Sequence, residues 1–138
     1  MSGGAGSEIG AALSVAPLSD PAPPDTPEWN ALGYLHANCG SCHNPSSIVM
    51  DKVDLELWMR AAELTTVEGT RSYMSTVDVA LTDTGGPLSV RIAPGDSAMS
   101  GLIMRMQTRG EMEAMPPIAS EQVDTDGVTL ISNWIDGL

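Results

Sequence analysis

The stretch "LHANCGSCHNP", residues 35 to 45, contains both cysteines of the chain and one of its two histidines. Cys39 and Cys42 are separated by two residues, and His43 follows directly. Three kinds of site use thiols and an imidazole at such a spacing: a dithiol redox centre, a zinc site and a covalently attached haem. The rest of the sequence has to distinguish between them.

The dithiol alternative depends on where a helix lies relative to the cysteines. In a thioredoxin-type centre the helix begins at the first cysteine, and its N-terminus lowers the pKa of that thiol. In this chain the helical pattern comes before the cysteines, because Thr26 suits an N-cap and Pro27 suits the first helical position. The sequence predicts a helix from Pro27 to about Cys39, which places the thiols at the wrong helix end.

The zinc alternative depends on the number and spacing of ligands. Structural zinc sites usually take their ligands from two separated arms of the chain. The available side chains are crowded into eight residues, and the chain has no other Cys or His. These side chains are His36, Cys39, Cys42 and His43. The spacing therefore disfavours zinc.

The haem alternative fits the motif best. The string Cys39-Gly40-Ser41-Cys42-His43 is C-x-x-C-H, the attachment signature of c-type haem. Two thiols at this spacing can add to the two vinyl groups on one edge of a porphyrin, and the adjacent imidazole can turn to the iron. The sequence thus predicts one covalent haem c, attached at Cys39 and Cys42 and ligated by His43.

A second axial ligand to the iron is sought among the remaining histidine and the methionines. His36 lies on the same local segment as the motif, so we expect a surface or propionate-edge position for it. Met115 sits on an irregular loop before Pro116-Pro117, and a loop held by proline can present a thioether as a fixed ligand. Met115 is the predicted ligand and Met112 the alternative. Three further methionines follow a helical pattern and are expected in the core: Met99, Met104 and Met106.

Composition and charge restrict the class of protein. Six basic and eighteen acidic residues give the 138-residue chain a formal net charge of -12, which argues against nucleic acid as a partner. No segment has the ~18 uninterrupted apolar residues of a membrane span. The chain has three Trp, two Tyr and no Phe, but nine Met. Either a bulky cofactor fills the centre of the core, or the core is made of Leu, Ile, Val and Met alone.

The chain divides into an arm and one domain. Residues 1–26 are rich in Gly, Ala, Ser and Pro, which predicts a flexible arm that becomes a Pro-rich linker. This arm has no basic region before its short apolar run, so it does not resemble a signal peptide. The chain is then either a mature or trimmed form or a cytoplasmic protein. Residues 27–138 are predicted to form a single domain.

Two more helices and an irregular middle region are expected within the domain. Asp96 is a candidate N-cap for a helix through about Thr108, and Asp124 for an amphipathic helix that runs to the C-terminus. The middle region, residues 44–95, contains helix formers in 53–64. Its two alternating stretches, "TVDVALT" and "LSVRI", flank the turn signal "DTGGP" and suggest a short β-hairpin.

From about Thr26 to Leu138 the chain resembles the class I, cytochrome c-like haem domains of bacteria. The resemblance implies a mainly α fold around one covalent haem, with thioether links and with His43 and Met115 as axial ligands. It also implies N- and C-terminal helices that cross, with small Ala31 or Gly33 against Trp134. The matching residues outside the haem motif are Pro94-Gly95-Asp96, Ser100, Leu102, Arg105-Met106, Met115-Pro116-Pro117, Asp124, Gly127, Ile131 and Trp134-Ile135 to Leu138.

The chain departs from the mitochondrial pattern in two respects. No proline stands a dozen residues after His43, where its carbonyl would accept the Nδ1 proton; Leu55 occupies that distance. The residue that orients the imidazole is therefore not identified. The span from His43 to Met115 is also long, so the middle region is expected to form an elaborated layer over the haem.

These features predict outer-sphere electron transfer and no catalysis by the chain itself. With both axial positions filled, no substrate reaches the iron, and His/Met ligation favours a moderate-to-high reduction potential. One alternative is the electron-relay module of a larger dehydrogenase or oxidoreductase, as the Pro-rich linker allows. Another is a gas-binding haem sensor, which requires a weak or absent sixth ligand.

Partners and location follow from charge and from the attachment chemistry. Acidic stretches near the Met115 loop suggest a redox partner with a basic docking patch, although the acidity could equally serve solubility. Arg91, Arg105 and Arg109 are candidate donors to the haem propionates, with a plain surface role as the alternative for each. Covalent haem attachment implies the periplasm or the outer face of a bacterium.

Overall fold

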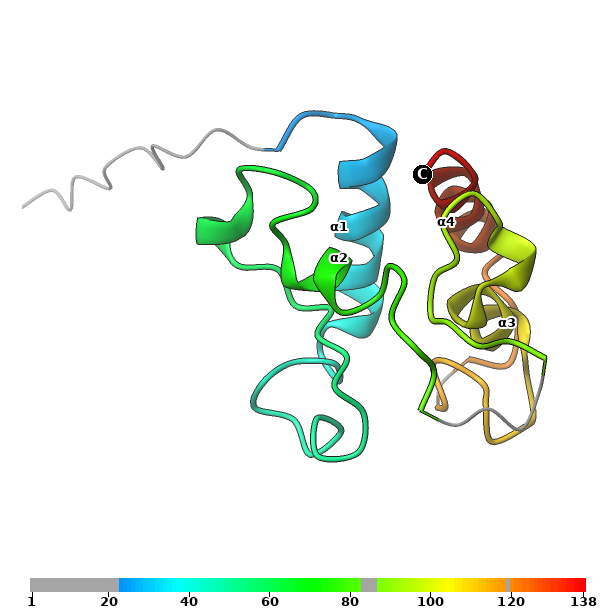
Figure 1. The fold of residues 1–138 in the computed structure, drawn as a ribbon. Coiled ribbons are helices and arrows are strands. Elements are labelled where there is room, and N and C mark those ends of the chain that lie inside the picture. The colour runs from blue at the N-terminus through cyan, green and yellow to red at the C-terminus, as the bar shows by residue number, and fades with distance from the viewer. Residues whose placement is uncertain (1–22, 83–86, 119) are drawn as a thin grey trace, which may run out of the picture.

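The computed structural model describes residues 23–82, 87–118 and 120–138, and in this part the protein is mainly helical with no β-sheet (Figure 1). The predicted arm, residues 1–26, lies outside the described residues except for its last four. The mainly α class is confirmed. The elements are α1 (Pro27–Cys39), the 3₁₀ turn η1 (Ala61–Glu63), α2 (Arg71–Met74), the 3₁₀ turn η2 (Ser97–Met99), α3 (Gly101–Gln107) and α4 (Thr125–Asp136).

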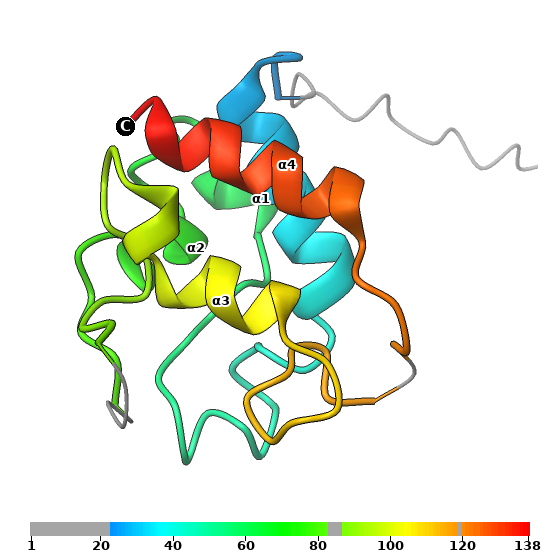
Figure 2. The same ribbon diagram turned by 90° about the vertical axis from the view of Figure 1, so that its right-hand side faces the viewer.

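The first and last helices cross and pack against each other, as Figure 2 shows. Both begin where the sequence predicts: Pro27 opens α1, where the Thr26 side chain makes no capping hydrogen bond, and the Asp124 carboxylate accepts a 2.9 Å hydrogen bond from the Gly127 N–H at the start of α4. The last helix ends at Asp136, before the predicted end at the C-terminus. Their apolar faces form most of a single core, and the leucine, isoleucine and tryptophan side chains in it are buried. This core includes Leu32, Leu35, Val128, Ile131, Trp134 and Ile135.

At Gly127 the two helices leave no room for a side chain, because a Cβ would lie 2.2 Å from the Tyr34 hydroxyl oxygen. Ala31 is fully buried, in the same core as Trp134. Gly33, in contrast, has open space around it, since no atom lies within 4 Å of a Cβ built there. Of the two alternatives expected beside Trp134, the structure thus favours Ala31 over Gly33, and Gly127 on α4 is a further small residue at the contact.

The helix predicted from Asp96 to Thr108 is divided at Ser100, which has an extended backbone. The Asp96 side chain does cap, but it caps η2, by accepting a 3.1 Å hydrogen bond from the Met99 N–H. The Ser100 hydroxyl donates to the Asp96 carbonyl and accepts from the Ala93 N–H, both at 2.9 Å. These two bonds hold a bend before α3 that a continuous helix would not contain.

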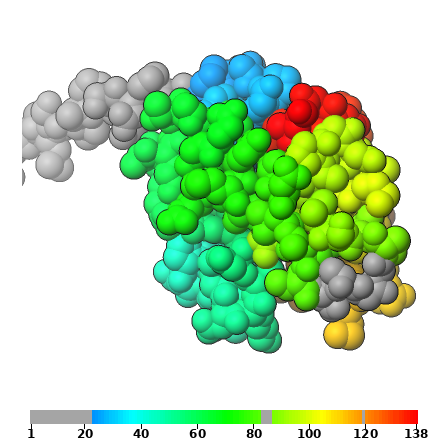
Figure 3. Space-filling view, viewed as in Figure 1, coloured from blue at the N-terminus to red at the C-terminus, as the bar shows by residue number. Residues whose placement is uncertain are grey.

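The middle layer, residues 53–82 and 87–93, packs against α1 with little regular structure, and Figure 3 shows it in front of much of that helix on one side. The helix formers of 53–64 give only η1, because backbone groups of this segment bond to other segments. The Leu57 N–H donates to the His43 carbonyl at 2.8 Å, and the Ser75 hydroxyl donates to the Glu56 carbonyl at 3.0 Å. The short α2 was not predicted.

The expected β-hairpin is present only as an antiparallel pairing between the two predicted segments. Ala80 and Val90 form an isolated antiparallel bridge. Hydrogen bonds from the Leu81 N–H to the Ser89 carbonyl (2.9 Å) and from the Arg91 N–H to the Val79 carbonyl (2.8 Å) extend it. No strand forms in the described ranges, and the predicted turn at residues 83–86 lies outside them.

Buried polar groups hold the middle layer together. Arg91 is only 6% exposed, and its Nη1 donates to the carbonyls of Asp54 and Ser75. Thr76 is fully buried, and its hydroxyl donates to the Ser72 carbonyl at 2.6 Å. The layer thus depends on specific hydrogen bonds, whereas the α1–α4 pair depends on apolar packing.

Across the part of the chain with assigned structure, no helix has both the length and the apolar character to cross a membrane.

Candidate functional site

The C-x-x-C-H motif forms a tight turn that continues directly from α1. Cys39 is the last helical residue, and its carbonyl accepts hydrogen bonds from the N–H groups of Cys42 (3.1 Å) and His43 (2.9 Å). The Asn44 side chain closes the turn by donating to the carbonyls of Gly40 and Ser41, at 3.0 and 2.8 Å. These bonds fix the direction in which the motif's side chains leave the backbone.

Gly40 is necessary because the turn packs against the middle layer. A Cβ at this position would lie 2.6 Å from the His36 carbonyl oxygen and 3.1 Å from that of Leu57. Both neighbours are backbone atoms, which cannot move independently of their segments. The first variable residue of the motif therefore allows close contact between the end of α1 and the extended segment that also bonds to the His43 carbonyl.

A cavity of about 380 Å³ lies directly beside the motif. Its wall comes from two sides of the molecule: α1 and the segment that follows it on one, and α3 with the loop leading to α4 on the other (Figure 1). Cys39 and His43 line the first side, and Met115 lines the second. The volume lies within the ~300–1,000 Å³ of cofactor sites, and most of the wall is apolar, as in such sites. Apolar lining residues include Val53, Leu55, Leu57, Leu81, Leu102 and Met106.

His43 is buried at the inner end of this site. Its pKa is lowered from 6.5, chiefly by burial; the backbone carbonyl of Leu55 opposes the shift, and the charge of Arg91 adds to it. The imidazole is therefore neutral near pH 7, the state in which a nitrogen can bind a metal. Nδ1 is buried without a partner that meets hydrogen-bond geometry.

The two cysteines differ in environment. Cys39 is half-buried in the cavity wall, whereas Cys42 is exposed, and both thiols are free. Burial, together with the nearby Cys42, raises the pKa of the Cys39 thiol to about 11. A reactive dithiol requires a lowered pKa, so this environment opposes the dithiol alternative.

Two methionines line the cavity: Met106, which belongs to the core on α3, and Met115, which lies on the loop after it and is the predicted ligand. Met115 is half-buried in the cavity wall, and its N–H donates to the Arg105 carbonyl at 3.0 Å. Met112 is 93% exposed and contributes nothing to the wall. Met106 belongs to the core as predicted, whereas Met99 is 46% exposed, so the expectation of a core position for Met99 is wrong.

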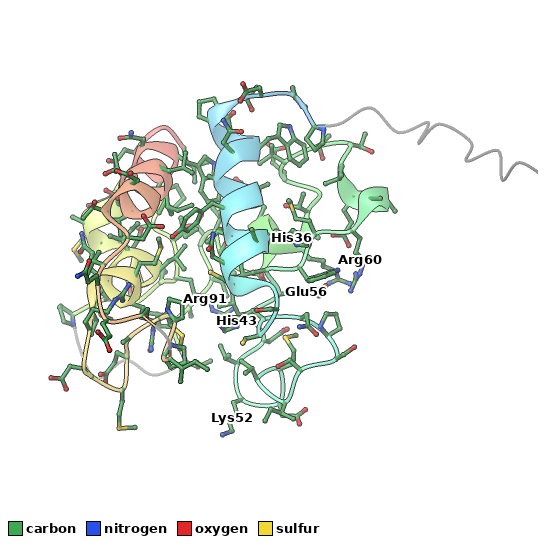
Figure 4. The ribbon with its side chains drawn as sticks, turned by 180° about the vertical axis from the view of Figure 1, so that it is seen from behind. His36, His43, Lys52, Glu56, Arg60 and Arg91 are labelled. Atoms are coloured by element: carbon green, nitrogen blue, oxygen red, sulfur yellow. The ribbon has the colours of Figure 1, made fainter. Side chains whose placement is uncertain are left out.

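His36 lies away from the cavity, on the side of α1 that faces Glu56 and Arg60 (Figure 4). Its Nδ1 accepts a 3.1 Å hydrogen bond from the Met59 N–H, and its ring makes an edge contact with Trp58 at a centroid distance of 4.6 Å. It thus joins α1 to the middle layer. Within the described ranges no three His, Cys, Asp or Glu side chains gather as a metal site, so the zinc alternative gains no ligand set.

Two polar wall residues were not anticipated from the sequence. The Tyr34 hydroxyl donates to the Asp124 carboxylate at 2.8 Å, and both residues line the cavity. Burial and the bond to Asp124 raise the pKa of Tyr34 above its ordinary value. The two residues are 90 positions apart, and no local sequence pattern indicates such a pair.

No model of a protein family matches the chain, and neither curated proteins nor solved structures gave a match. The chemistry of the site is therefore inferred from the motif and from the geometry of the cavity.

Proposed function

We propose that this chain is a monohaem electron-transfer protein of the c-type cytochrome class. The single observation that carries the proposal is the cavity, because it brings Cys39 and His43 of the C-x-x-C-H turn into one apolar wall opposite Met115. Met115 follows His43 by 72 positions and Cys39 by 76 in the sequence. The wall supplies the Cys39 thiol, a neutral imidazole and a thioether, and the exposed thiol of Cys42 lies in the same turn; together these are the groups that attach and ligate a haem.

Each residue would have a separate task. The thiols of Cys39 and Cys42 would each add to one vinyl group, so that an S–H bond and the π bond of the vinyl C=C are exchanged for an S–C bond and a C–H bond. His43 and Met115 would be the residues that hold the iron. The Leu55 carbonyl, which raises the pKa of His43, is our candidate for the group that orients the imidazole, as metal-binding histidines require.

The bound haem supplies reversible one-electron transfer at its iron. The protein's contribution is an apolar surrounding and two fixed ligands, which keep the coordination unchanged between the two oxidation states. His/Met ligation is expected to give a moderate-to-high potential. Catalysis then belongs to a partner, and attachment of the haem implies a periplasmic or extracellular location.

The acidic loops beside Met115 suggest the character of that partner. Glu111, Glu113 and Glu121 are exposed on the segment that carries Met115. A redox partner with a basic patch would be attracted to this side of the cavity, and the association rate would fall as ionic strength rises. An association rate independent of salt would remove this part of the proposal.

The test is the optical spectrum of protein produced in a host that matures c-type haem, compared with Met115→Ala and with Met112→Ala as the matched control. We expect a low-spin c-type spectrum with a far-red sulfur–iron band, lost in Met115→Ala and kept in Met112→Ala. Loss of the band in Met112→Ala alone would reassign the ligand. Rapid carbon monoxide binding to the ferrous protein would favour a gas-binding role, and a colourless protein would exclude haem.

A further inference from the structure

The charges around the cavity are distributed very differently from those of the whole chain. Of eighteen acidic and six basic residues, the wall contains one carboxylate and three arginines within the described ranges. The carboxylate is Asp124, which already accepts hydrogen bonds from Tyr34 and Gly127. The three remaining basic residues are all exposed away from the wall: Lys52 at a loop tip (Figure 4), Arg60 and Arg71.

The three wall arginines have no carboxylate partner among the described residues. The salt bridges found there belong to Arg60 alone. Arg91, Arg105 and Arg109 instead donate to backbone carbonyls, through Nη1 and, in Arg109, also through Nε. A guanidinium has five N–H donors, so the Nη2 group of each arginine retains donors toward an anion. An apolar cavity with such a cationic edge fits a ligand that has an apolar body and carboxylates at one edge.

Two of these arginines also hold the loop that carries Met115. Arg109 donates to the carbonyl of Met115 at 3.5 Å and to that of Gln122 at 3.1 Å, which ties the two ends of the loop together. The backbone carbonyl of Arg105 accepts a 3.0 Å hydrogen bond from the Met115 N–H. The side chain of Arg105 places Nη1 3.5 Å from the Glu113 carbonyl. Arg91 is different, since it holds the middle layer and lies near His43.

We propose that Arg109, assisted by Arg105, binds the carboxylates of the cofactor and thereby couples their position to that of the Met115 thioether. This inference rests on the proposed function, because it takes the ligand to be a haem with two propionates. A propionate held by Arg109 fixes the guanidinium, and the fixed guanidinium holds the Met115 carbonyl. The carboxylate edge and the axial thioether therefore stabilise each other through one side chain.

The experiment measures how easily imidazole displaces Met115 from the ferric haem protein. Arg109→Gln removes the positive charge and the five-donor guanidinium fork, and Arg71→Gln is the matched control, since Arg71 is exposed and outside the wall. We expect Arg109→Gln to bind imidazole about tenfold more tightly, as loss of a charge-assisted hydrogen bond implies, and Arg71→Gln to behave as the wild type. Equal imidazole affinities in the two variants would overturn the proposal.

A second readout separates carboxylate binding from a merely structural role. Loss of a positive charge beside the haem favours the ferric state, so the reduction potential should fall in Arg109→Gln and stay close to the wild-type value in Arg109→Lys. Arg109→Lys should still bind imidazole more tightly, because lysine lacks the fork that joins two carbonyls. An unchanged potential in Arg109→Gln would contradict carboxylate binding.

The outcomes also distinguish this proposal from the proposed function. If the chain carries no covalent haem, both the proposed function and the coupling are wrong. If it is a haem protein ligated by His43 and Met115 whose imidazole affinity does not depend on Arg109, only the coupling is wrong. If Arg109→Gln does not accumulate as a haem protein, Arg109→Lys serves in its place, and a wild-type imidazole affinity of that variant would again overturn the coupling.

Discussion

The crossed pair of helices α1 and α4 and the middle layer that packs against α1 are stabilised by different means. The helices bury apolar side chains, with Leu32, Ile131 and Ile135 fully inaccessible. The middle layer buries polar ones, with Thr76 fully inaccessible and Arg91 nearly so. Apolar burial tolerates variation in detail as long as volume is filled, whereas a buried hydrogen-bonding group requires its particular partner. The two regions should therefore respond differently to substitution.

The largest loss of stability is expected from Leu32→Ala, in the helical pair. The residue is fully buried in the core, and such truncations cost about 2–5 kcal/mol because a cavity remains. Denaturant unfolding of the two proteins, prepared identically, measures the difference. Leu138→Ala is the control: this leucine is 40% exposed, so a change within roughly 0.5 kcal/mol is expected.

In the middle layer, Arg91→Met should cost about 1.5–3 kcal/mol, because the carbonyls of Asp54 and Ser75 lose a charged donor. Methionine keeps much of the apolar stem, so the loss reports on the hydrogen bonds. Arg71→Met, at an exposed position of α2, should unfold close to the wild type. A near-zero effect of Arg91→Met would show that apolar packing also governs the middle layer.

The contact between the crossed helices is tested by two glycine substitutions that are expected to change the free energy of unfolding in opposite directions. Gly127→Ala places a methyl group 2.2 Å from the Tyr34 hydroxyl oxygen and should cost roughly 1–2 kcal/mol, in the lower range of overpacking, since a ring edge can shift. Gly33→Ala meets no atom within 4 Å and should stabilise its helix by up to about 1 kcal/mol. Thermal unfolding of both variants gives the comparison; a destabilised Gly33→Ala would mean that the crossing is tighter there than the structure shows.

The smallest effect is a pH dependence at the start of α4. Hydrogen bonds from the Gly127 N–H and the Tyr34 hydroxyl lower the pKa of Asp124 from 3.8. A carboxyl with a lowered folded-state pKa stabilises the protein above its ordinary pKa, and this contribution is lost as the pH falls through the lowered value. Asp124→Asn should thus be less stable than the wild type at neutral pH, and the difference should narrow in acid. Asp126→Asn, at an exposed position of the same turn, should show no comparable narrowing.

Local chemistry made the helical frame predictable. Thr26 and Pro27 mark the start of α1, Asp124 caps α4, and the apolar spacing of α4 identifies its buried face. The C-x-x-C-H motif is likewise a local pattern, and the structure places two of its residues, Cys39 and His43, in the cavity wall. Met115 was separable from Met112 because prolines follow it directly, and the structure places Met115 in the cavity wall and Met112 in solvent.

The middle layer was not predictable in the same way, since its conformation is decided by distant partners. The helix formers of 53–64 remain largely extended because their backbone groups bond to His43 and Ser75. The predicted helix from Asp96 is interrupted because the Ser100 hydroxyl bonds to two backbone groups around the bend. In both places a long-range or side-chain hydrogen bond outweighs the ordinary helix propensity of about 0–0.7 kcal/mol per residue.

The sequence by itself determined the helical frame, the haem-type motif and the candidate thioether, because each depends on residues close together in the chain. Only the tertiary structure decided that Arg91, Arg105 and Arg109 share one cavity wall, that Tyr34 meets Asp124, and that the Leu55 carbonyl raises the pKa of His43. Such contacts join segments tens of residues apart, and their free energy appears only when the whole chain is folded. Periodicity and capping carry no information about them.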